Sequence, residues 1–211
     1  MIYLDNSATT PLHPKVKETI INALDLFGNP SSIHKVGRKV RVLIEQNRQD
    51  IADFFNCSPE EIIFTGGASE ANNTVLKSAT ICCAFCNDSR GHIITSNIEH
   101  PSVLDTLKCL EQQHVDVTQL KVDKYGLINP ADVEAAIRPD TVMISIMYVN
   151  NEIGTIQPIQ KIADIAKKHN IPMHTDAVQA VGKIPIDLQT LPVDFLSMSG
   201  HKIYAPKGIG V

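Results

Sequence analysis

Hydrophobic residues recur at helical spacing in the first quarter of the chain. Over residues 14–27 the apolar side chains fall three or four positions apart, and the same recurrence runs through residues 38–55. Apolar residues at this spacing share one face of a helix, so both segments are predicted to be amphipathic helices. Pro14 fits the first turn of such a helix, where the backbone N–H has no partner.

The pattern then changes to short apolar runs separated by further helical segments. Residues 62–65 follow a turn at residues 58–61 that resembles a capping box, and they are almost wholly apolar, as in a strand covered on both faces. Five more strands are predicted at residues 92–96, 115–120, 141–147, 172–176 and 194–197. Helices are predicted between several of them, at residues 102–113, at residues 130–137 with Asn129 as the N-cap, and at residues 159–169.

Strands that alternate with helices predict an α/β fold. Crossover connections of this length give a mostly parallel sheet with helices on both faces. The sequence shows no repeat, linker or charge block, so one continuous domain is expected. Ligands of such sheets bind at the carboxyl ends of the strands, and candidate functional residues are therefore sought there.

The composition is that of an ordinary globular protein. Of the 211 residues 43% are apolar and 20% are charged, which excludes the disordered and low-complexity classes. A formal charge of -4 and a pI near 6.0 argue against a general binder of nucleic acid or anionic membranes. No apolar run approaches the roughly 20 residues that span a bilayer. The first residues also lack the basic flank and apolar core of a signal or transit peptide.

The cysteines favour a reducing compartment. They are five in number and form no repeating framework, so we expect reduced thiols and a cytoplasmic protein. Cys82, Cys83 and Cys86 could suggest a metal or redox site, but no second Cys/His pair follows at zinc-site spacing. These three are therefore expected to be buried or incidental thiols, and all five cysteines are expected to pack in the fold rather than to take part in chemistry.

A glycine-containing turn is the first candidate for ligand binding. Residues 65–70 join the predicted strand at 62–65 to a helix, and their small side chains would let backbone amides approach a phosphate at the helix N-terminus. The motif is not specific by itself, because a glycine pair in a tight turn accounts for it equally well.

An acid and a lysine at predicted strand ends suggest a cofactor. Asp176 ends a predicted buried strand, where a carboxylate is costly unless it meets a cation or several donors; capping the next turn is the alternative. Lys202 follows another predicted buried strand, so lost solvation would lower its pKa and favour Schiff-base chemistry, although most lysines are only surface charges. Together the pair suggests pyridoxal phosphate, whose aldehyde needs a lysine and whose ring nitrogen needs an acid.

Seven short motifs follow one another along the whole chain. They are LDNSATTP at 4–11, GNPSSIH at 28–34, TGGASE at 65–70, EH at 99–100, VNNEIG at 149–154, DAVQ at 176–179 and SGHK at 199–202. In this order they resemble the signatures of cysteine desulfurases with the class V aminotransferase fold. The resemblance is greatest to the branch that serves iron–sulfur clusters and tRNA thiolation.

The resemblance implies a fold and a set of roles. Residues 1–211 would form the N-terminal segment and the large domain of a pyridoxal-phosphate-dependent transferase of fold type I, incomplete at the C-terminus and without the small C-terminal domain. Lys202 would form a Schiff base with the cofactor, Asp176 would pair with its ring nitrogen, and Gln179 would bind its ring oxygen. His100 would stack on the ring and could transfer protons; the alternative is a helix-start or core histidine.

The other implied site residues bind the phosphate or lie near the ring. The phosphate would be held by Ala68, Ser69, Ser199 and His201, and Gly200 would be a further cofactor-binding residue. Asn151 would lie near the ring and the substrate carboxylate. No metal is implied.

The resemblance also implies a reaction. L-Cysteine would displace Lys202 from the cofactor, and the released Lys202 amine would act as base. A separate enzyme cysteine would then take the sulfur as a persulfide, leaving alanine, and would pass it to an acceptor protein. A homodimer is implied as well.

The sequence departs from the family in one respect. Members of the family carry the persulfide cysteine, a substrate-binding arginine and a phosphate contact for the neighbouring subunit beyond the position that matches Val211. A second polypeptide would be needed if these groups are not supplied covalently. Another class V enzyme, such as a selenocysteine lyase or an aminotransferase, and a non-catalytic fragment that binds cofactor or partners are the alternatives.

Overall fold

A five-stranded sheet forms the centre of the protein. The computed structural model describes residues 2–86 and 91–211, without the side chains of residues 81–86. The strand order is β2-β1-β3-β4-β5, and every neighbouring pair is parallel. The strands are β1 (His92–Ser96), β2 (Asp116–Leu120), β3 (Thr141–Ser145), β4 (Met173–Asp176) and β5 (Phe195–Ser197). The predicted parallel α/β fold is confirmed.

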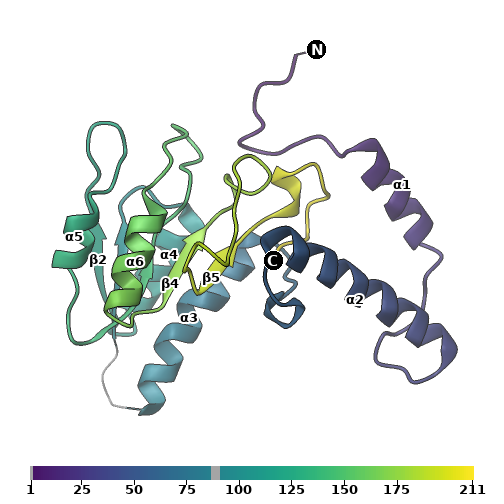
Figure 1. Ribbon diagram of the computed structural model, residues 1–211, viewed down its shortest axis with the longest axis horizontal. Helices are drawn as coiled ribbons and strands as arrows, with labels where there is room; N and C mark the ends of the chain where they lie inside the picture. Colours follow the sequence, from purple (N-terminus) through teal and green to yellow (C-terminus); the bar gives the residue numbers. More distant parts are fainter. Residues whose placement is uncertain (1, 87–90) are drawn as a thin grey trace.

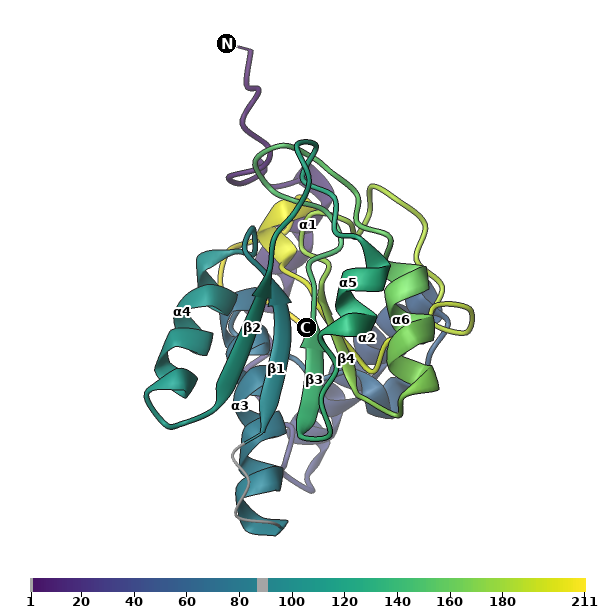
Figure 2. The same ribbon diagram turned by 90° about the vertical axis from the view of Figure 1, so that its left-hand side faces the viewer.

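Helices cover both faces of the sheet, as expected (Figures 1 and 2). The helices α3 (Ala68–Cys86) and α4 (Pro101–Glu111) lie on one face, and α5 (Pro130–Ala135) and α6 (Ile159–Lys168) lie on the other. Successive strand residues point to opposite faces. Ile93 of β1 accordingly belongs to the apolar cluster under α3 and α4, whereas the next residue, Ile94, belongs to the cluster under α5 and α6. None of these helices is long and apolar enough to cross a membrane, and this holds for every helix in the described ranges.

The strand order places a topological switch beside β1. The chain leaves β1 toward β2 on one side and returns to β3 on the other. At such a switch the connections diverge above the carboxyl ends of the strands and leave room for a ligand. A ligand site is therefore expected at the carboxyl ends of β1 and β3.

An N-terminal arm projects from the sheet (Figure 1). It consists of α1 (Pro14–Ala23) and α2 (Lys35–Phe55) and the segment that joins them. Both predicted helices are present, although α1 ends four residues earlier than predicted and α2 begins three residues earlier, with His34 as its N-cap. No residue of α1 is buried, and Phe27 after it is 86% exposed. The amphipathic pattern is real, but within the described chain little covers the apolar face of α1, whereas α2 packs against the core at its C-terminal end through Phe55.

The predicted strand at residues 62–65 is wrong. Only Thr65 forms a bridge, antiparallel to Gly210, and Ile63 is 67% exposed. A strand needs a neighbour along its length, and residues 62–64 have none in the described chain. The capping box before it is confirmed, because the N–H of Ser58 donates to the Glu61 carboxylate at 2.8 Å ahead of the short helix η1 (Pro59–Glu61).

The strand β5 is less buried than predicted. Phe195 is 39% exposed, because β5 pairs with β4 on one side and forms the edge of the sheet on the other. Beyond β5 the chain makes one further bridge, between Ser199 and Gly210, which is antiparallel. The strand β3 also ends at Ser145, two residues before the predicted end.

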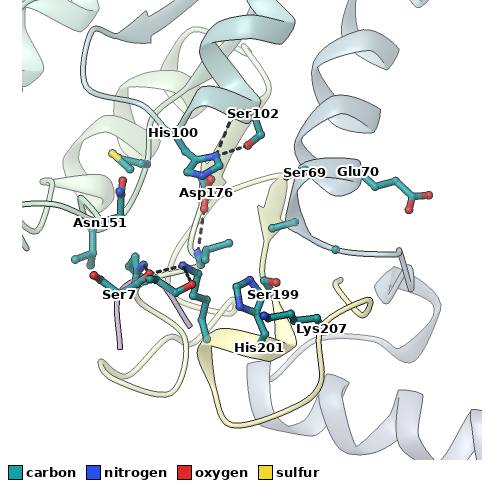
Figure 3. Close-up of a pocket in the computed structure, with 18 of the residues that line it drawn as sticks. Ser7, Ser69, Glu70, His100, Ser102, Asn151, Asp176, Ser199, His201 and Lys207 are labelled. Carbon is teal, nitrogen blue, oxygen red and sulfur yellow. Dashed lines mark hydrogen bonds between the residues drawn. The ribbon is translucent and has the colours of Figure 1, made fainter. Parts of the chain in front are cut away.

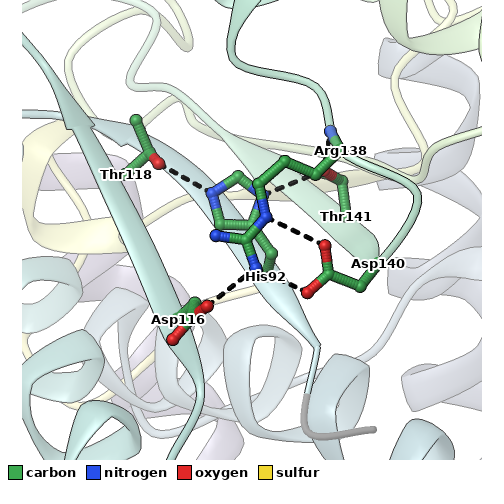
Figure 4. A network of polar contacts seen from close by, with 6 residues as sticks. All are labelled: His92, Asp116, Thr118, Arg138, Asp140 and Thr141. Carbon is green, nitrogen blue, oxygen red and sulfur yellow. Dashed lines mark hydrogen bonds and ion pairs between the residues drawn. The ribbon is translucent and has the colours of Figure 1, made fainter.

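Two buried histidines tie neighbouring strands together. His92 of β1 lies between the hydroxyls of Thr118 on β2 and Thr141 next to it on β3, at 2.7 and 2.9 Å (Figure 4). His174 of β4 lies in the same way between Ser145 of β3 and Ser197 of β5, at 2.8 and 3.0 Å. Each ring thus satisfies both nitrogens with hydroxyl groups of the two adjacent strands, which a neutral imidazole can do.

An ion-pair cluster lies beside His92. The Arg138 guanidinium contacts Asp116 at 2.7 Å and Asp140 at 2.6 Å (Figure 4). The contacts raise the pKa of Arg138 and lower that of Asp140. The cluster is exposed, so it joins the loop before β3 to β2 without a large contribution to stability.

We predict that His174 makes folding sensitive to acid. Burial lowers the pKa of His174 from 6.5, the value expected in the unfolded chain, to about 4 in the folded chain. Between these two pH values only the unfolded chain binds the proton. Stability should therefore fall by about 2 kcal/mol between about pH 7.5 and pH 5. In His174→Gln this part of the fall should vanish, as measured by urea unfolding at both pH values. The control Ser145→Ala loses a hydrogen bond but should keep the pH dependence; an equal fall in His174→Gln would contradict the assignment.

Candidate active site

A pocket of about 850 Å³ lies at the carboxyl ends of β1, β3, β4 and β5 (Figure 3). The first turn of α3 and the N-terminal segment around Ser7 close its sides. Nine of the ten site residues expected from the sequence line it, namely Ala68, Ser69, His100, Asn151, Asp176, Gln179, Ser199, His201 and Lys202. The tenth, Gly200, is buried and does not line the pocket.

Asp176 is the last residue of β4 and presents a buried carboxylate to the pocket. It is 5% exposed, and its two oxygens accept hydrogen bonds from the Val178 N–H at 3.0 Å and from the Asn72 amide at 2.8 Å. Burial raises the pKa of Asp176, whereas these two donors and the nearby charges of His100 and Lys202 oppose the rise. Asp176 therefore caps the following turn and also faces the pocket, so both interpretations of the sequence hold.

No cation pairs directly with this carboxylate. Across residues 2–86 and 91–211, Asp176 has no ion-pair partner within 4.0 Å. A buried carboxylate is most favourable when a cation or a charged ligand meets it. The pocket thus contains an acid suited to a positively charged group on a ligand.

Lys202 lies on the short helix η2 (Gly200–Lys202), not directly at the end of β5 as predicted. Its Nζ donates to the backbone carbonyl of Ala8 at 2.9 Å and to that of Ser7. Partial burial lowers the pKa of Lys202, and the charge of Asp176 opposes this only in part. A lowered pKa increases the fraction of neutral amine, which is the nucleophilic and basic form.

The N-terminal segment is fastened to the turn that carries Lys202. The Thr10 hydroxyl donates to the His201 carbonyl at 2.8 Å, and it accepts from the Tyr204 N–H at 2.7 Å. The Thr9 hydroxyl contacts the His201 ring at 3.0 Å. These contacts join residues about 190 positions apart, and they explain how the first sequence motif reaches the pocket, a role that sequence reasoning did not assign to it.

His100 is the N-cap of α4 and also lines the pocket. Its Nδ1 accepts from the backbone N–H of Ser102 at 3.1 Å and lies 2.8 Å from the Ser102 hydroxyl (Figure 3). Because Nδ1 is an acceptor in this arrangement, a neutral ring carries its proton on Nε2. The helix-start alternative and the placement in the pocket are therefore both correct.

Gln179 has a fixed amide orientation. Its Oε1 accepts from Lys183 Nζ at 2.6 Å, and its Nε2 donates to the Ser7 carbonyl at 2.9 Å. Since lysine can only donate, the oxygen must face Lys183 and the NH₂ group must face the pocket side. Partial burial lowers the pKa of Lys183, and the charge of Lys202 adds to this effect.

The two asparagines of the motif at residues 149–154 have different roles. Asn150 is buried, where its oxygen accepts the N–H groups of Glu152 and Ile153 and its NH₂ group donates to the Ile98 carbonyl. Asn151 lines the pocket, and its amide donates to Glu152 at 2.6 Å. Asn150 thus shapes the loop that presents Asn151.

The first turn of α3 can hold an anion. The carbonyl of Gly67 accepts the N–H groups of Glu70 and Ala71, both at 3.1 Å, which leaves those of Ala68 and Ser69 at the pocket wall. The first N–H groups of a helix have no partner within it and favour negative charge. Gly67 has a φ of +151°, and a side chain there would be strained. The expected phosphate turn is consistent with this geometry.

A cation on the same side was missed by sequence reasoning. Lys207 lines the pocket, and Figure 3 shows it beside His201 and Ser199. Its position after a proline and before a glycine gave no periodic signal. Lysine, serine hydroxyl and imidazole together are a donor set suited to a phosphate.

Glu99, beside His100, is a second buried carboxyl. Both its oxygens accept the Met147 N–H, at 3.0 and 2.9 Å, and the Ser96 hydroxyl donates to it at 2.5 Å. Burial raises the pKa of Glu99 to about 8, and the charge of Asp176 adds to the rise. Glu99 is therefore mostly neutral near pH 7 and joins β1 to the end of β3.

The cysteines whose side chains the structure describes lie outside the pocket. Cys57 is partly buried against the core, as expected, and its pKa is raised by burial and by Glu61. Cys109 is exposed on α4, so the expectation that it packs is wrong. The side chains of Cys82, Cys83 and Cys86 lie outside the described part of the structure.

Residues 2–211 match the aminotransferase class-V family. The chain is 49% identical to a protein named cysteine desulfurase IscS from Dictyoglomus turgidum, over 99% of the chain and 52% of the relative. It is 47% identical to a protein named cysteine desulfurase, mitochondrial, from Saccharomyces cerevisiae, over 99% of the chain and 42% of the relative. A solved structure titled SspA in complex with cysteine matches with a TM-score of 0.96 and 45% identity, over the whole chain and 60% of its own. The chain thus spans about half the length of the curated relatives it matches.

We predict that Glu99→Gln stabilises the fold at alkaline pH. The folded chain holds the Glu99 proton up to about pH 8, whereas the unfolded chain releases it near 4.5, so wild-type stability falls as pH rises through this window. Glutamine stays neutral, so the gain of Glu99→Gln over wild type should be roughly 3.5 kcal/mol larger at pH 8 than at pH 5. Urea unfolding at about pH 5 and pH 8 measures this; Glu61→Gln at the exposed capping box is the control. A gain that is the same at both pH values would sink the idea.

Proposed function

Because the chain belongs to the aminotransferase class-V family, we propose that it supplies the cofactor site of a pyridoxal-phosphate-dependent cysteine desulfurase. The reaction converts L-cysteine to L-alanine and passes the sulfur, as a persulfide, to an acceptor protein for iron–sulfur cluster or thio-cofactor synthesis. One observation supports the proposal above all. The buried carboxylate of Asp176, which has no paired cation within the described ranges, shares a pocket with the amine of Lys202.

The residues of the pocket fit pyridoxal phosphate. Its ring nitrogen would supply the positive charge that Asp176 lacks, and its phosphate would meet the amides of Ala68 and Ser69. When bound, the cofactor offers an aldehyde to amines and withdraws electrons from the α-carbon of an attached amino acid. The pocket volume of about 850 Å³ leaves room for a small amino acid beside it.

Each candidate residue has a role that its contacts allow. Lys202 would hold the cofactor covalently, and Asp176 would keep the ring nitrogen protonated. The NH₂ group of Gln179 faces the side on which it could donate to the ring oxygen. His100 would stack on the ring, and Asn151 would lie near the substrate carboxylate.

Phosphate binding would be shared by two elements. Ser199 and His201 would act from the turn before Lys202, joined by Ala68 and Ser69 of α3. Gly200 contributes through its lack of a side chain, because a Cβ there would lie 2.7 Å from Ile209 and 3.2 Å from Ala205.

Lys202 is the residue best placed to move a proton. Burial favours its neutral amine, and the carbonyls of Ser7 and Ala8 hold Nζ at the edge of the pocket. As a free amine, Nζ could take the proton from the α-carbon of L-cysteine. Lys202 therefore has two consecutive roles.

The persulfide thiol is proposed to lie outside this chain. Cys57 lines a different pocket from the proposed site. Its raised pKa reduces the fraction of thiolate, the form that attacks the substrate sulfur. Cys109 is exposed on α4, and α4 contributes only its first turn to the pocket. We propose that residues 1–211 form the N-terminal arm and the cofactor-binding large domain, and that the other half of the protein, or a second polypeptide, carries the thiol.

The exposed arm supports a homodimer. Large apolar side chains on α1, α2 and the segment between them are uncovered, including Leu24, Phe27, Ile33 and Val42. Apolar patches of this kind mark protein interfaces.

We also propose a cytoplasmic location. The number of cysteines is odd and they form no disulfide framework, which suits a reducing compartment.

We predict that pyridoxal phosphate attaches to Lys202. Incubation with the cofactor followed by borohydride reduction should leave it on the peptide that contains Lys202, as read by mass spectrometry. Lys202→Ala should lose the label. Lys207→Ala, which changes the other lysine at this end of the pocket, should keep it on Lys202. A label on Lys207, or none in the unchanged chain, would contradict the proposed site.

We predict that L-cysteine is turned over only when the remaining half of the protein is present. Alanine and sulfide are measured after addition of L-cysteine, with and without that half. The double variant Cys57→Ser/Cys109→Ser should keep the activity. Turnover by residues 1–211 alone, lost on Cys57→Ser or Cys109→Ser, would overturn the proposed location of the thiol. Cofactor binding without turnover in either case would favour a non-catalytic fragment.

A further inference from the structure

A buried asparagine lies behind the two pocket residues that face the cofactor ring in the proposed function. Asn72 is the fifth residue of α3 and is fully buried. Its single NH₂ group donates to Asp176 at 2.8 Å and to the Ser102 hydroxyl at 3.0 Å. It thereby joins α3 to the end of β4 and to the start of α4.

The direction of each hydrogen bond in this chain of contacts is determined. The Asn72 NH₂ group can only donate, so the Ser102 oxygen accepts from it, and the serine proton is free for His100. The Ser102 hydroxyl lies 2.8 Å from His100 Nδ1, which also accepts the Ser102 backbone N–H. One amide thus supports the charge of Asp176 and the acceptor state of His100 Nδ1.

Stability alone does not explain an asparagine at this position. The Oδ1 atom of Asn72 is buried and has no hydrogen-bond partner in the part of the chain that the structure describes. Leaving such an acceptor unsatisfied is unfavourable, whereas an apolar side chain of similar size would avoid it. A function of the NH₂ group accounts for the residue.

We propose that Asn72 and Ser102 are positioning residues, which hold Asp176 ionised and His100 with its proton on Nε2 in readiness for the cofactor. This inference rests on the proposed function. Neither residue needs to touch the substrate, because each acts through a neighbour. Asn72 sets the state of both groups from one atom, so loss of the amide should affect them together.

The test uses Asn72→Leu, with Asn73→Leu as the matched control. Asn73 is the next residue of α3 and donates only to backbone carbonyls, those of Ser69 and Ser102. The titration of the Asp176 carboxyl is followed by ¹³C NMR without cofactor. Asn72→Leu should raise the pKa of Asp176, because a donor to the ionised form is gone, and it should weaken pyridoxal phosphate binding roughly tenfold. Asn73→Leu should do neither.

The Ser102 arm is tested separately, at the partly exposed start of α4 where folding is less at risk. Ser102→Ala should shift the ¹⁵N resonance of His100 Nδ1 and leave the Asp176 titration unchanged, and Ser102→Thr should restore the resonance. A folded Asn72→Leu with an unaltered Asp176 titration would overturn the proposal. Should Asn72→Leu not fold, an unaltered Nδ1 resonance in Ser102→Ala would overturn it. If the unchanged protein does not bind the cofactor, the proposed function fails, yet the NMR titrations still decide the positioning role.

Discussion

The site depends on one buried carboxyl group. Asp176 ends a central strand of a sheet covered on both faces, and burial alone would drive its carboxyl toward the neutral form. Two donors, from the following turn and from α3, oppose this and favour the ionised form. A buried charge is tolerated when it is hydrogen-bonded and met by a counter-charge, and the described chain supplies only the first condition directly. The pocket is therefore suited to a positively charged group beside Asp176.

The same burial acts in opposite directions on the neighbouring groups. It raises the pKa of Glu99 to about 8 and lowers that of His174 to about 4, so both are mostly neutral near pH 7. Both tie strands together beneath the pocket, Glu99 through Met147 and His174 through two serines. Neutral groups at these two positions add no charge beside Asp176, so they do not shift its pKa by repulsion or attraction near pH 7.

The sequence predicted the sheet and its coverage but not every pairing. Continuous apolar runs and capping signals are local, so most elements and the N-cap at Asn129 were found from the chain alone. The run at residues 62–65 has the same composition, yet a strand exists only with a neighbour. Among the residues that the structure describes, only Gly210 bridges to it. Phe195 is exposed for a similar reason, because its strand β5 lies at the edge of the sheet. Such facts depend on residues far away in the chain, which apolar periodicity does not register.

The site shows the same division between local and distant signals. Asp176, Lys202 and the glycine turn carry recognisable chemistry at element ends, and the structure brings them to one pocket. Asn72 carries no such sign, since an asparagine inside a helix usually faces solvent and its contacts lie 30 and 104 residues away. The adjacent asparagines at positions 72 and 73, in the second turn of α3, were the available signal. Asn72 lies on the buried face of α3, the helix that begins at the proposed phosphate-binding turn. A buried polar residue at such a place indicates that it positions another group of the pocket, here Asp176.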